Sequence, residues 1–205
     1  EDIRSGDNFA LRFAAERGHL HVLQFLVKFR DSNGSQLTLA DIRSDDNYAL
    51  RWSAHNGHLQ VLQFLVAFMD PCGSKLTLED IRSGYNLALC RAAENGHLHV
   101  LQFLVKFRDS NGSGLTLEDI RSNYNYAIRG AASNGHLHVL QFLQEFRDPN
   151  HNLNETYSRL NIEDFHSFNN SALRWSAANG HLHVLQFLNS FKNSDGTHSG
   201  FTLRD

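Results

Sequence analysis

Cysteine is scarce in this sequence of 205 residues, which contains only Cys72 and Cys90. Neither cysteine recurs in the internal repeats of the chain, so we interpret both as isolated thiols and not as a disulfide framework. Isolated thiols are typical of a reducing compartment. The scarcity therefore predicts an intracellular, cytoplasmic location.

Long apolar runs and an excess of positive charge are also missing. No run approaches 18 consecutive apolar residues, so we expect no contact with a membrane. Lys and Arg together number 19 against 22 Asp and Glu, and the formal net charge is −3. Binding to a phosphate backbone favours a basic excess, so nucleic acid is not the expected partner. Two sets of recurring arginines keep nucleic-acid binding as an alternative: Arg4, Arg43, Arg82 and Arg121, and Arg12, Arg51, Arg129 and Arg174.

The sequence lacks the common catalytic signatures. It has neither a glycine-rich phosphate loop nor a Gly-x-Ser-x-Gly elbow. An aspartate recurs two residues before an arginine in four units, and we interpret this column as a structural hydrogen bond or ion pair: Asp2, Asp41, Asp80 and Asp119. We therefore expect no enzyme activity and no cofactor.

Thirteen histidines raise the question of a metal site. Most belong to a His-x-His pair, such as His19 and His21, and residues two apart on a helix point about 200° from each other. Equivalent residues of stacked repeats lie roughly 8–10 Å apart, whereas zinc ligands lie about 2.0–2.1 Å from the ion. We expect no metal. The first histidine of each pair should pack at a helix start, and the second should be an exposed surface residue.

The chain contains five copies of one repeat unit. The motif Gly-His-Leu-His-Val-Leu-Gln-Phe-Leu begins at Gly18 and returns, with Gln60 as its one change, at 57–65, 96–104, 135–143 and 180–188. Successive copies lie 39 residues apart, and the last lies 45 residues after the fourth. Such periods indicate a stacked array in which no unit buries its apolar face alone. We predict a single array over 1–205, with approximate units 1–39, 40–78, 79–117, 118–162 and 163–205.

Each unit is predicted to contain two helices. In the first unit a short alanine-rich helix follows Asn8, which we expect to cap its N-terminus, and Gly18 ends it. The second helix runs from about His19 to Phe29. It carries too many apolar residues for one stripe, so we expect it to be buried on two sides.

The segments between units have their own pattern. Thr77 is followed three residues later by Asp80, which predicts a single helical turn, and other units repeat the pair. A six-residue insertion within Asn150 to Arg159 is expected to lengthen a loop.

The segment Asn47 to Leu59 reads Asn-Tyr-Ala-Leu-Arg-Trp-Ser-Ala-His-Asn-Gly-His-Leu. It resembles the ankyrin repeat, whose helical pair reads Thr-Pro-Leu-His-x-Ala-Ala-x-x-Gly-His-Leu, and the match covers all five units. The Thr-Pro-Leu-His tetrapeptide is absent, and the period is 39 rather than about 33. The amino-acid sequence of these units is similar to that of ankyrin arrays of amoebae and their large viruses.

This resemblance implies an all-α solenoid that recognises a protein through its concave face and performs no chemistry. Its extra residues fall before the Asp41–Ser44 segment, where the family has a hairpin, so we expect altered geometry there. An alternative is that the array is the substrate-targeting portion of a longer enzyme or effector.

Positions that vary among the copies are the candidates for partner binding, because stacking does not require them to be constant. They lie just after the hairpin position and along the first helix, which the resemblance places on the recognition face. Aromatic residues there would supply interface contact area. The candidates are Asp7, Asp46, Tyr48, Trp52, His55, Tyr85, Arg91, Glu94, Tyr124, Tyr126, Gly130 and Ser133.

One column of the first helix changes character in the middle of the array. It contains Phe13, Trp52 and Trp175 in three units, but Arg91 and Gly130 in the other two. We expect Trp52 to stack under the Arg91 guanidinium and Gly130 to leave a notch beside it. The sequence thus predicts a small docking site for an acidic or aromatic group of the partner.

Overall fold

The computed structural model describes residues 3–148 and 159–190, which form a chain of helices. Within these two segments no strand is assigned, and extended pairing is limited to an isolated bridge between Met69 and Lys75. The predicted all-α fold is confirmed. The loop insertion predicted within Asn150 to Arg159 falls almost entirely outside the described residues.

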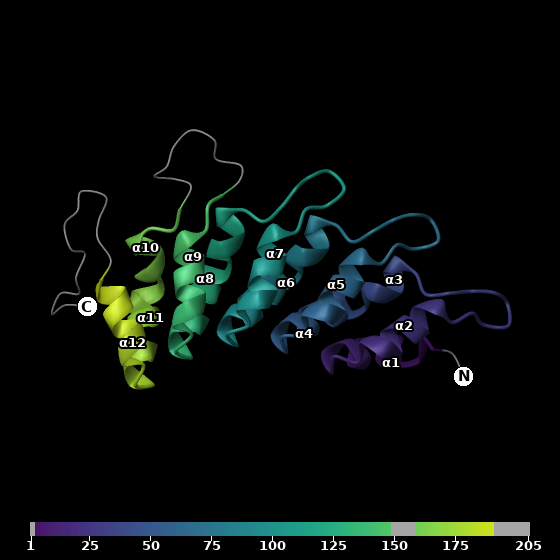
Figure 1. The fold of residues 1–205 in the computed structure, drawn as a ribbon, viewed down its shortest axis with the longest axis horizontal. Helices are drawn as coiled ribbons and strands as arrows, with labels where there is room; N and C mark the ends of the chain where they lie inside the picture. Colours follow the sequence, from purple (N-terminus) through teal and green to yellow (C-terminus); the bar gives the residue numbers. More distant parts are fainter. Residues whose placement is uncertain (1–2, 149–158, 191–205) are drawn as a thin grey trace.

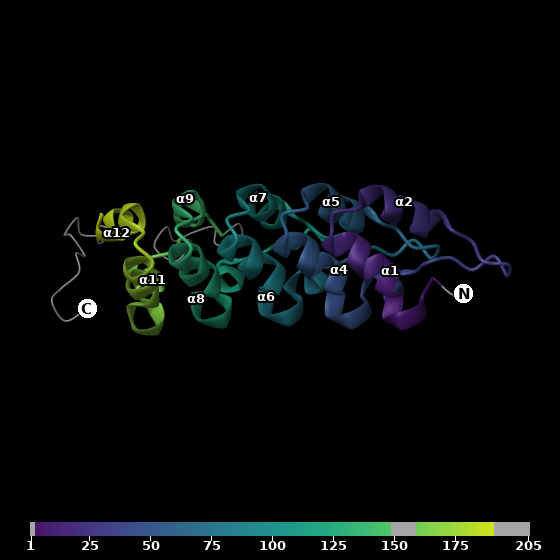
Figure 2. The same cartoon turned by 90° about the horizontal axis from the view of Figure 1, so that it is seen from below.

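The helices form two parallel rows (Figure 2). We call the first the inner row: α1 (Ser5–Glu16), α4 (Ser44–His55), α6 (Leu78–Glu94), α8 (Leu117–Ser133) and α11 (Ser167–Ala178). We call the second the outer row: α2 (Leu20–Lys28), α5 (Leu59–Ala67), α7 (Leu98–Lys106), α9 (Leu137–Glu145) and α12 (Leu182–Asn189). Each inner helix packs on its neighbours in the row and on the outer helix that comes after it in the chain.

Small side chains fill the inner row, and leucines fill the space between the rows. Ala92 and Ala93 of α6 are fully buried, which lets adjacent inner helices approach closely. In α7, Val100, Leu101 and Leu104 are fully buried, while the neighbouring apolar positions are partly covered by the adjacent repeats. The middle outer helices are thus packed between neighbours, as their apolar excess predicts.

A capped helical turn precedes the inner helices, as predicted. Thr77 and Asp80 form a capping box at the start of α6, in which the Thr77 backbone N–H donates to Asp80 Oδ2 at 2.7 Å. The same reciprocal cap occurs at the start of α8, α3 (Leu39–Ile42) and α10 (Ile162–Phe165). A helical turn therefore occupies the place of the hairpin that the resemblance implied.

The array bends into a shallow arch. Figure 1 shows that the helix ends carrying the long inter-repeat loops are splayed further apart than the opposite ends, where the Gly-His turns lie. Among the described helices, none is both long and apolar enough to cross a membrane.

The N-terminus of each inner helix is unlike the expected asparagine cap. Three consecutive residues there have left-handed dihedral angles, and we call each such triplet a tip: 6–8, 45–47, 84–86, 123–125 and 168–170. Asn47, the third residue of its tip, is buried with φ of 58°, and its Oδ1 accepts no hydrogen bond. The Oδ1 atoms of Asn8, Asn86 and Asn125 are likewise buried and unpaired. These asparagines are therefore turn residues that tolerate positive φ, and the predicted capping by their side chains is wrong.

Candidate protein-binding surface

The first set of recurring arginines joins each repeat to the next. Arg82 Nε and Nη2 donate to the two carboxylate oxygens of Asp119 at 2.8 and 2.9 Å. Equivalent ion pairs link Arg4 to Asp41, Arg43 to Asp80 and Arg121 to Asp164. The predicted structural role of the Asp-x-Arg column is confirmed for these residues, although Asp2 lies outside the described part of the chain. Each of these guanidiniums is thus paired with a carboxylate of the following repeat.

The carboxylates of Asp41, Asp80 and Asp119 are buried and held in their charged form. Asp119 is 6% exposed, and burial alone would raise its pKa. The Arg82 guanidinium and the Thr116 backbone N–H outweigh that effect, so the pKa of Asp119 lies below its ordinary value of 3.8. The pKa values of Asp41 and Asp80 are lowered in the same way.

From the second motif onward, the first histidine of the motif packs on the glycine of the preceding motif. Gly96 has φ of 74°, and a Cβ atom built on it would lie 2.7 Å from Nδ1 of His136. The same close approach joins Gly18 to His58, Gly57 to His97 and Gly135 to His181. Glycine is required here because it reaches positive φ at low cost and because the imidazole fills the space of any side chain.

The second histidine also bridges repeats. His138 Nε2 lies 3.0 Å from the carbonyl oxygen of Gly96, and His99 and His183 make the same hydrogen bond to Gly57 and Gly135. These histidines are exposed, as predicted, but they are not ordinary surface positions. The sequence could not show this because their partner is a backbone carbonyl.

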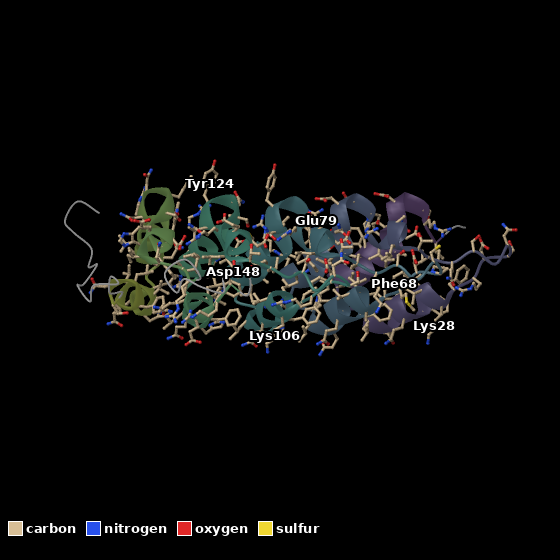
Figure 3. The ribbon with its side chains drawn as sticks, turned by 90° about the horizontal axis from the view of Figure 1, so that it is seen from above. Lys28, Phe68, Glu79, Lys106, Tyr124 and Asp148 are labelled. Atoms are coloured by element: carbon tan, nitrogen blue, oxygen red, sulfur yellow. The ribbon has the colours of Figure 1, made fainter. Side chains whose placement is uncertain are left out.

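Four candidate binding residues occupy the middle position of a tip and face solvent. Tyr85 and Tyr124 are 83% and 71% exposed, and Asp7 and Asp46 are exposed at the same position of the first two tips. Tyr124 projects from the edge of the array formed by the inner row, away from the outer helices (Figure 3). Lys28 and Lys106, which belong to the outer row, lie along the opposite edge of the array. The structure thus brings these four variable residues to one edge of the array.

A further aromatic residue belongs with them. Phe168, in the fifth tip, is 60% exposed, and its ring centroid lies 5.8 Å from that of Tyr124. We call Tyr85, Tyr124 and Phe168 the aromatic ridge. Phe168 is not among the candidates predicted from the sequence because it stands one position earlier in its tip than the tyrosines do.

The second set of recurring arginines supports the tips. Arg129 Nε donates to the carbonyl oxygen of Tyr124 at 2.7 Å, and its guanidinium lies 4.6 Å from the Phe168 ring centroid. Arg51 Nη2 donates to the carbonyl oxygen of Asp45 at 2.8 Å. In the third repeat Cys90 stands at this position, and its buried thiol has a pKa raised to about 11 by burial. No guanidinium of that position therefore supports the third tip.

The other candidates lie deeper in the inner row and contact residues of their own repeat or of a neighbouring one. The Tyr48 hydroxyl donates to Glu16 at 2.6 Å, and burial together with this bond raises the pKa of Tyr48 to about 12. Trp52 packs edge-on against His55, with ring centroids 4.8 Å apart. The Ser133 carbonyl accepts from Asn179 Nδ2 at 2.7 Å. These residues contribute to the scaffold.

The predicted notch beside Arg91 is filled. A Cβ atom built on Gly130 would lie 3.0 Å from Cβ of Glu94, so Glu94 occupies the space that the missing side chain leaves. Arg91 Nη1 donates to Glu94 at 2.5 Å and to the Tyr126 hydroxyl at 3.0 Å. Its guanidinium lies over the Tyr126 ring, at 5.5 Å from the centroid, instead of over Trp52 as predicted. The error arose because sequence spacing does not show which neighbouring repeat a long side chain faces.

Stacked helical pairs, Gly-His turns and one exposed variable edge define a solenoid of the ankyrin type. Comparison with known families agrees: a family model described as ankyrin repeats in three copies matches residues 89–200, and one described as ankyrin repeats in many copies matches residues 11–66. The chain belongs to the ankyrin-repeat family. No curated protein matches it significantly. Members of this family are in general protein–protein interaction modules and are typically not catalytic.

Proposed function

We propose that this array binds a protein partner along the edge of the inner row that carries the tips. The observation that carries the proposal is the aromatic ridge, in which three consecutive tips each present a large, exposed aromatic side chain. Tyrosine and phenylalanine are enriched at interfaces, where they supply rigid contact area. Apart from the contacts of Phe168 with Tyr124 and Arg129, these side chains point into solvent.

The backbone beneath the ridge supports the same conclusion. Tyr85, Tyr124 and Phe168 have φ values of 60°, 55° and 55°, and non-glycine residues in this region cost about 1–2 kcal/mol each. Bulky residues placed in a strained conformation with their side chains in water do not stabilise the fold. All five tips share this backbone conformation, and what distinguishes the third to fifth tips is the bulky aromatic side chain that each one exposes.

The contacts that the recurring arginines make within the chain favour a protein over nucleic acid as the partner. The first set forms ion pairs with buried aspartates, and Arg12, Arg51 and Arg129 donate to tip carbonyls. The binding candidates that remain accessible on the tips are aromatic or acidic. This surface suits a protein better than a phosphate backbone.

The proposal is tested by removing the ridge without changing the fold. In the double variant Tyr85→Asn with Tyr124→Asn, asparagine retains the tolerance for positive φ, and Asn169 shows that it occurs at this tip position. The tagged wild-type chain and the variant would be incubated with an extract of the source cells, and retained proteins would be quantified by mass spectrometry. We expect at least one protein to be retained at least fivefold less by the variant.

A matched control is available on the outer row. Gln63→Ala with Gln102→Ala changes two exposed residues of α5 and α7 and should leave retention within twofold of the wild type. Equal retention by all three proteins, or equal loss in both variants, would exclude the ridge as the binding surface. Circular dichroism melting of each variant verifies that the fold is intact.

A further inference from the structure

Charge is distributed unevenly along the tips. The first and second tips carry the carboxylates of Asp7, Asp45 and Asp46, whereas the third to fifth carry the aromatic ridge. The two kinds of side chain meet between the second and third tips. Asp46 Oδ2 lies 3.5 Å from the Cβ position of Gly84, the residue before Tyr85, and the Asp46 side chain is 61% exposed.

Other aromatic rings of the inner row already carry a guanidinium from the chain itself. Arg12 lies over Tyr48 at 5.1 Å, and Arg91 and Arg129 lie over Tyr126 at 5.5 Å. Within the described residues no cation of the chain lies over Tyr85, and Cys90 replaces the arginine that would support this tip. In the described part of the chain Tyr85 therefore has no cation over its ring, and it directly follows Gly84, whose Cβ position lies next to the Asp46 carboxylate.

The nearest arginine does not neutralise this place. Arg51 lies 3.8 Å from Asp46 Oδ2, but its Nη2 also donates to the carbonyl oxygen of Asp45 at 2.8 Å. An ion pair of that length on an exposed carboxylate is weak, because water screens it. The Asp46 carboxylate thus remains available to a second cation.

We propose that Asp46 and Tyr85 together bind a lysine or arginine side chain of an extended segment of the partner protein. The carboxylate supplies the charge, and the face of the tyrosine ring supplies a cation–π contact. This inference rests on the proposed function and specifies the partner's chemistry. An acidic segment would be repelled at the same place.

The spacing of the tips determines where the partner segment carries its next anchoring side chain. Equivalent residues of stacked repeats lie about 8–10 Å apart, and an extended chain rises about 3.3 Å per residue. A segment running along the tips therefore advances three residues per repeat. Tyr124 and Phe168 lie in the fourth and fifth tips, two repeats beyond the second and third tips that hold Asp46 and Tyr85. The segment therefore presents an apolar side chain to them six positions from the basic residue, on the same face of the extended chain.

Defined peptides test this pattern. The probes are fluorescein-labelled nine-residue peptides of Ser, Ala and Gln in which one Arg and one Leu stand six positions apart, in either order. We expect the better order to bind the wild-type chain, in fluorescence polarisation at low salt, with a Kd at least fivefold lower than its Glu-for-Arg counterpart. Moving Leu to three or five positions from Arg, which turns it to the other face of the extended chain, should raise the Kd at least threefold. Equal Kd values for the Arg and Glu peptides would overturn the proposal.

Matched variants locate the site. Asp46→Asn and Tyr85→Asn should each raise the Kd of the Arg peptide about fivefold, whereas Asp7→Asn, at the same position of the first tip, should change it less than twofold. Tight binding that survives both Asp46→Asn and Tyr85→Asn would overturn the assignment. If extract proteins still require Tyr85 and Tyr124 while the Arg peptides do not, the interaction surface stands and its preference for a basic residue is refuted.

Discussion

At the scale of single residues, the contact between a glycine and the next repeat's histidine explains why Gly-His is constant in this chain. Gly96 needs positive φ and also leaves room for His136. Gly180 has almost the same φ, 75° against 74°, but nothing lies within 4 Å of its Cβ position among the described residues. The two glycines therefore separate the cost of the backbone conformation from the cost of the steric contact.

Gly96→Ala should lower the free energy of unfolding more than Gly180→Ala does. Alanine at positive φ costs about 1 kcal/mol at either position. At Gly96 the added methyl group must also displace the His136 ring, and such overpacking costs a further ~1–3 kcal/mol. Urea denaturation followed by circular dichroism measures both changes. Equal losses for the two variants would show that the histidine moves without cost.

At the scale of elements, the tip is a left-handed turn inserted between two right-handed helices. It redirects the chain from the capped turn into the inner helix and exposes its middle residue to water. Its third residue is an asparagine in all five repeats and is buried in the first four, whereas the two residues before it vary. The element thus separates a constant structural residue from variable surface residues.

Tyr85→Gly should stabilise the fold and weaken partner binding. Glycine relieves the strain at φ of 60°, and its greater freedom in the unfolded chain offsets part of that gain, so we expect a net increase of about 0.5–1 kcal/mol. Thermal and urea denaturation would measure this increase, and the extract-binding assay would measure the loss of retention. As a control, Gly84→Ala in the same tip should reduce stability, since alanine would adopt φ of 61°. A destabilised Tyr85→Gly chain would mean that the ring supports the tip.

At the scale of the whole molecule, the same set of contacts recurs at successive repeat interfaces. Each interface combines an Arg–Asp pair, whose carboxylate is buried, with histidines packed at the Gly-His turns. Because the contacts are titratable and repeated, acid acts at several interfaces together. Array stability is approximately a sum of such nearest-neighbour terms.

Stability should fall in two stages as the pH is lowered. Burial lowers the pKa values of His55, His97 and His136 below 6.5, so the unfolded chain binds protons first and stability decreases as the pH falls below about 6.5. The lowered pKa values of Asp41, Asp80 and Asp119 add a second loss as the pH falls from about 3.8 through the pKa values of the folded state. Urea titrations between pH 8 and 3 would show both stages. A constant urea midpoint between pH 7 and 5 would contradict the first stage. The double variant His97→Gln with His136→Gln should lose less stability in that stage than the wild type does.

The sequence was sufficient for the architecture because the relevant signals are periodic. The Gly-His motif predicted the stacking, and Thr77 with Asp80 predicted the capped turn. It was not sufficient for the tips, since Tyr85 and Phe168 do not favour positive φ and asparagine at the third tip position equally suits a helix cap. The prediction of a notch beside Arg91 was wrong for another reason. Gly130 indicates that a side chain is missing, but the sequence does not show that Glu94 occupies the space. Periodic burial is encoded locally, whereas strain and side-chain direction depend on the neighbouring repeat.

The directionality of the Arg–Asp and Gly-His contacts has a consequence for how such a chain gains and loses repeats during evolution. Every middle unit presents arginine and glycine to its successor and aspartate and histidine to its predecessor. Duplication of one 39-residue unit therefore creates a junction whose complementary halves are already present, and deletion of one unit rejoins matching halves. The first two residues of each tip have no partner in this scheme, so each new copy can acquire a different exposed side chain while the junctions stay the same.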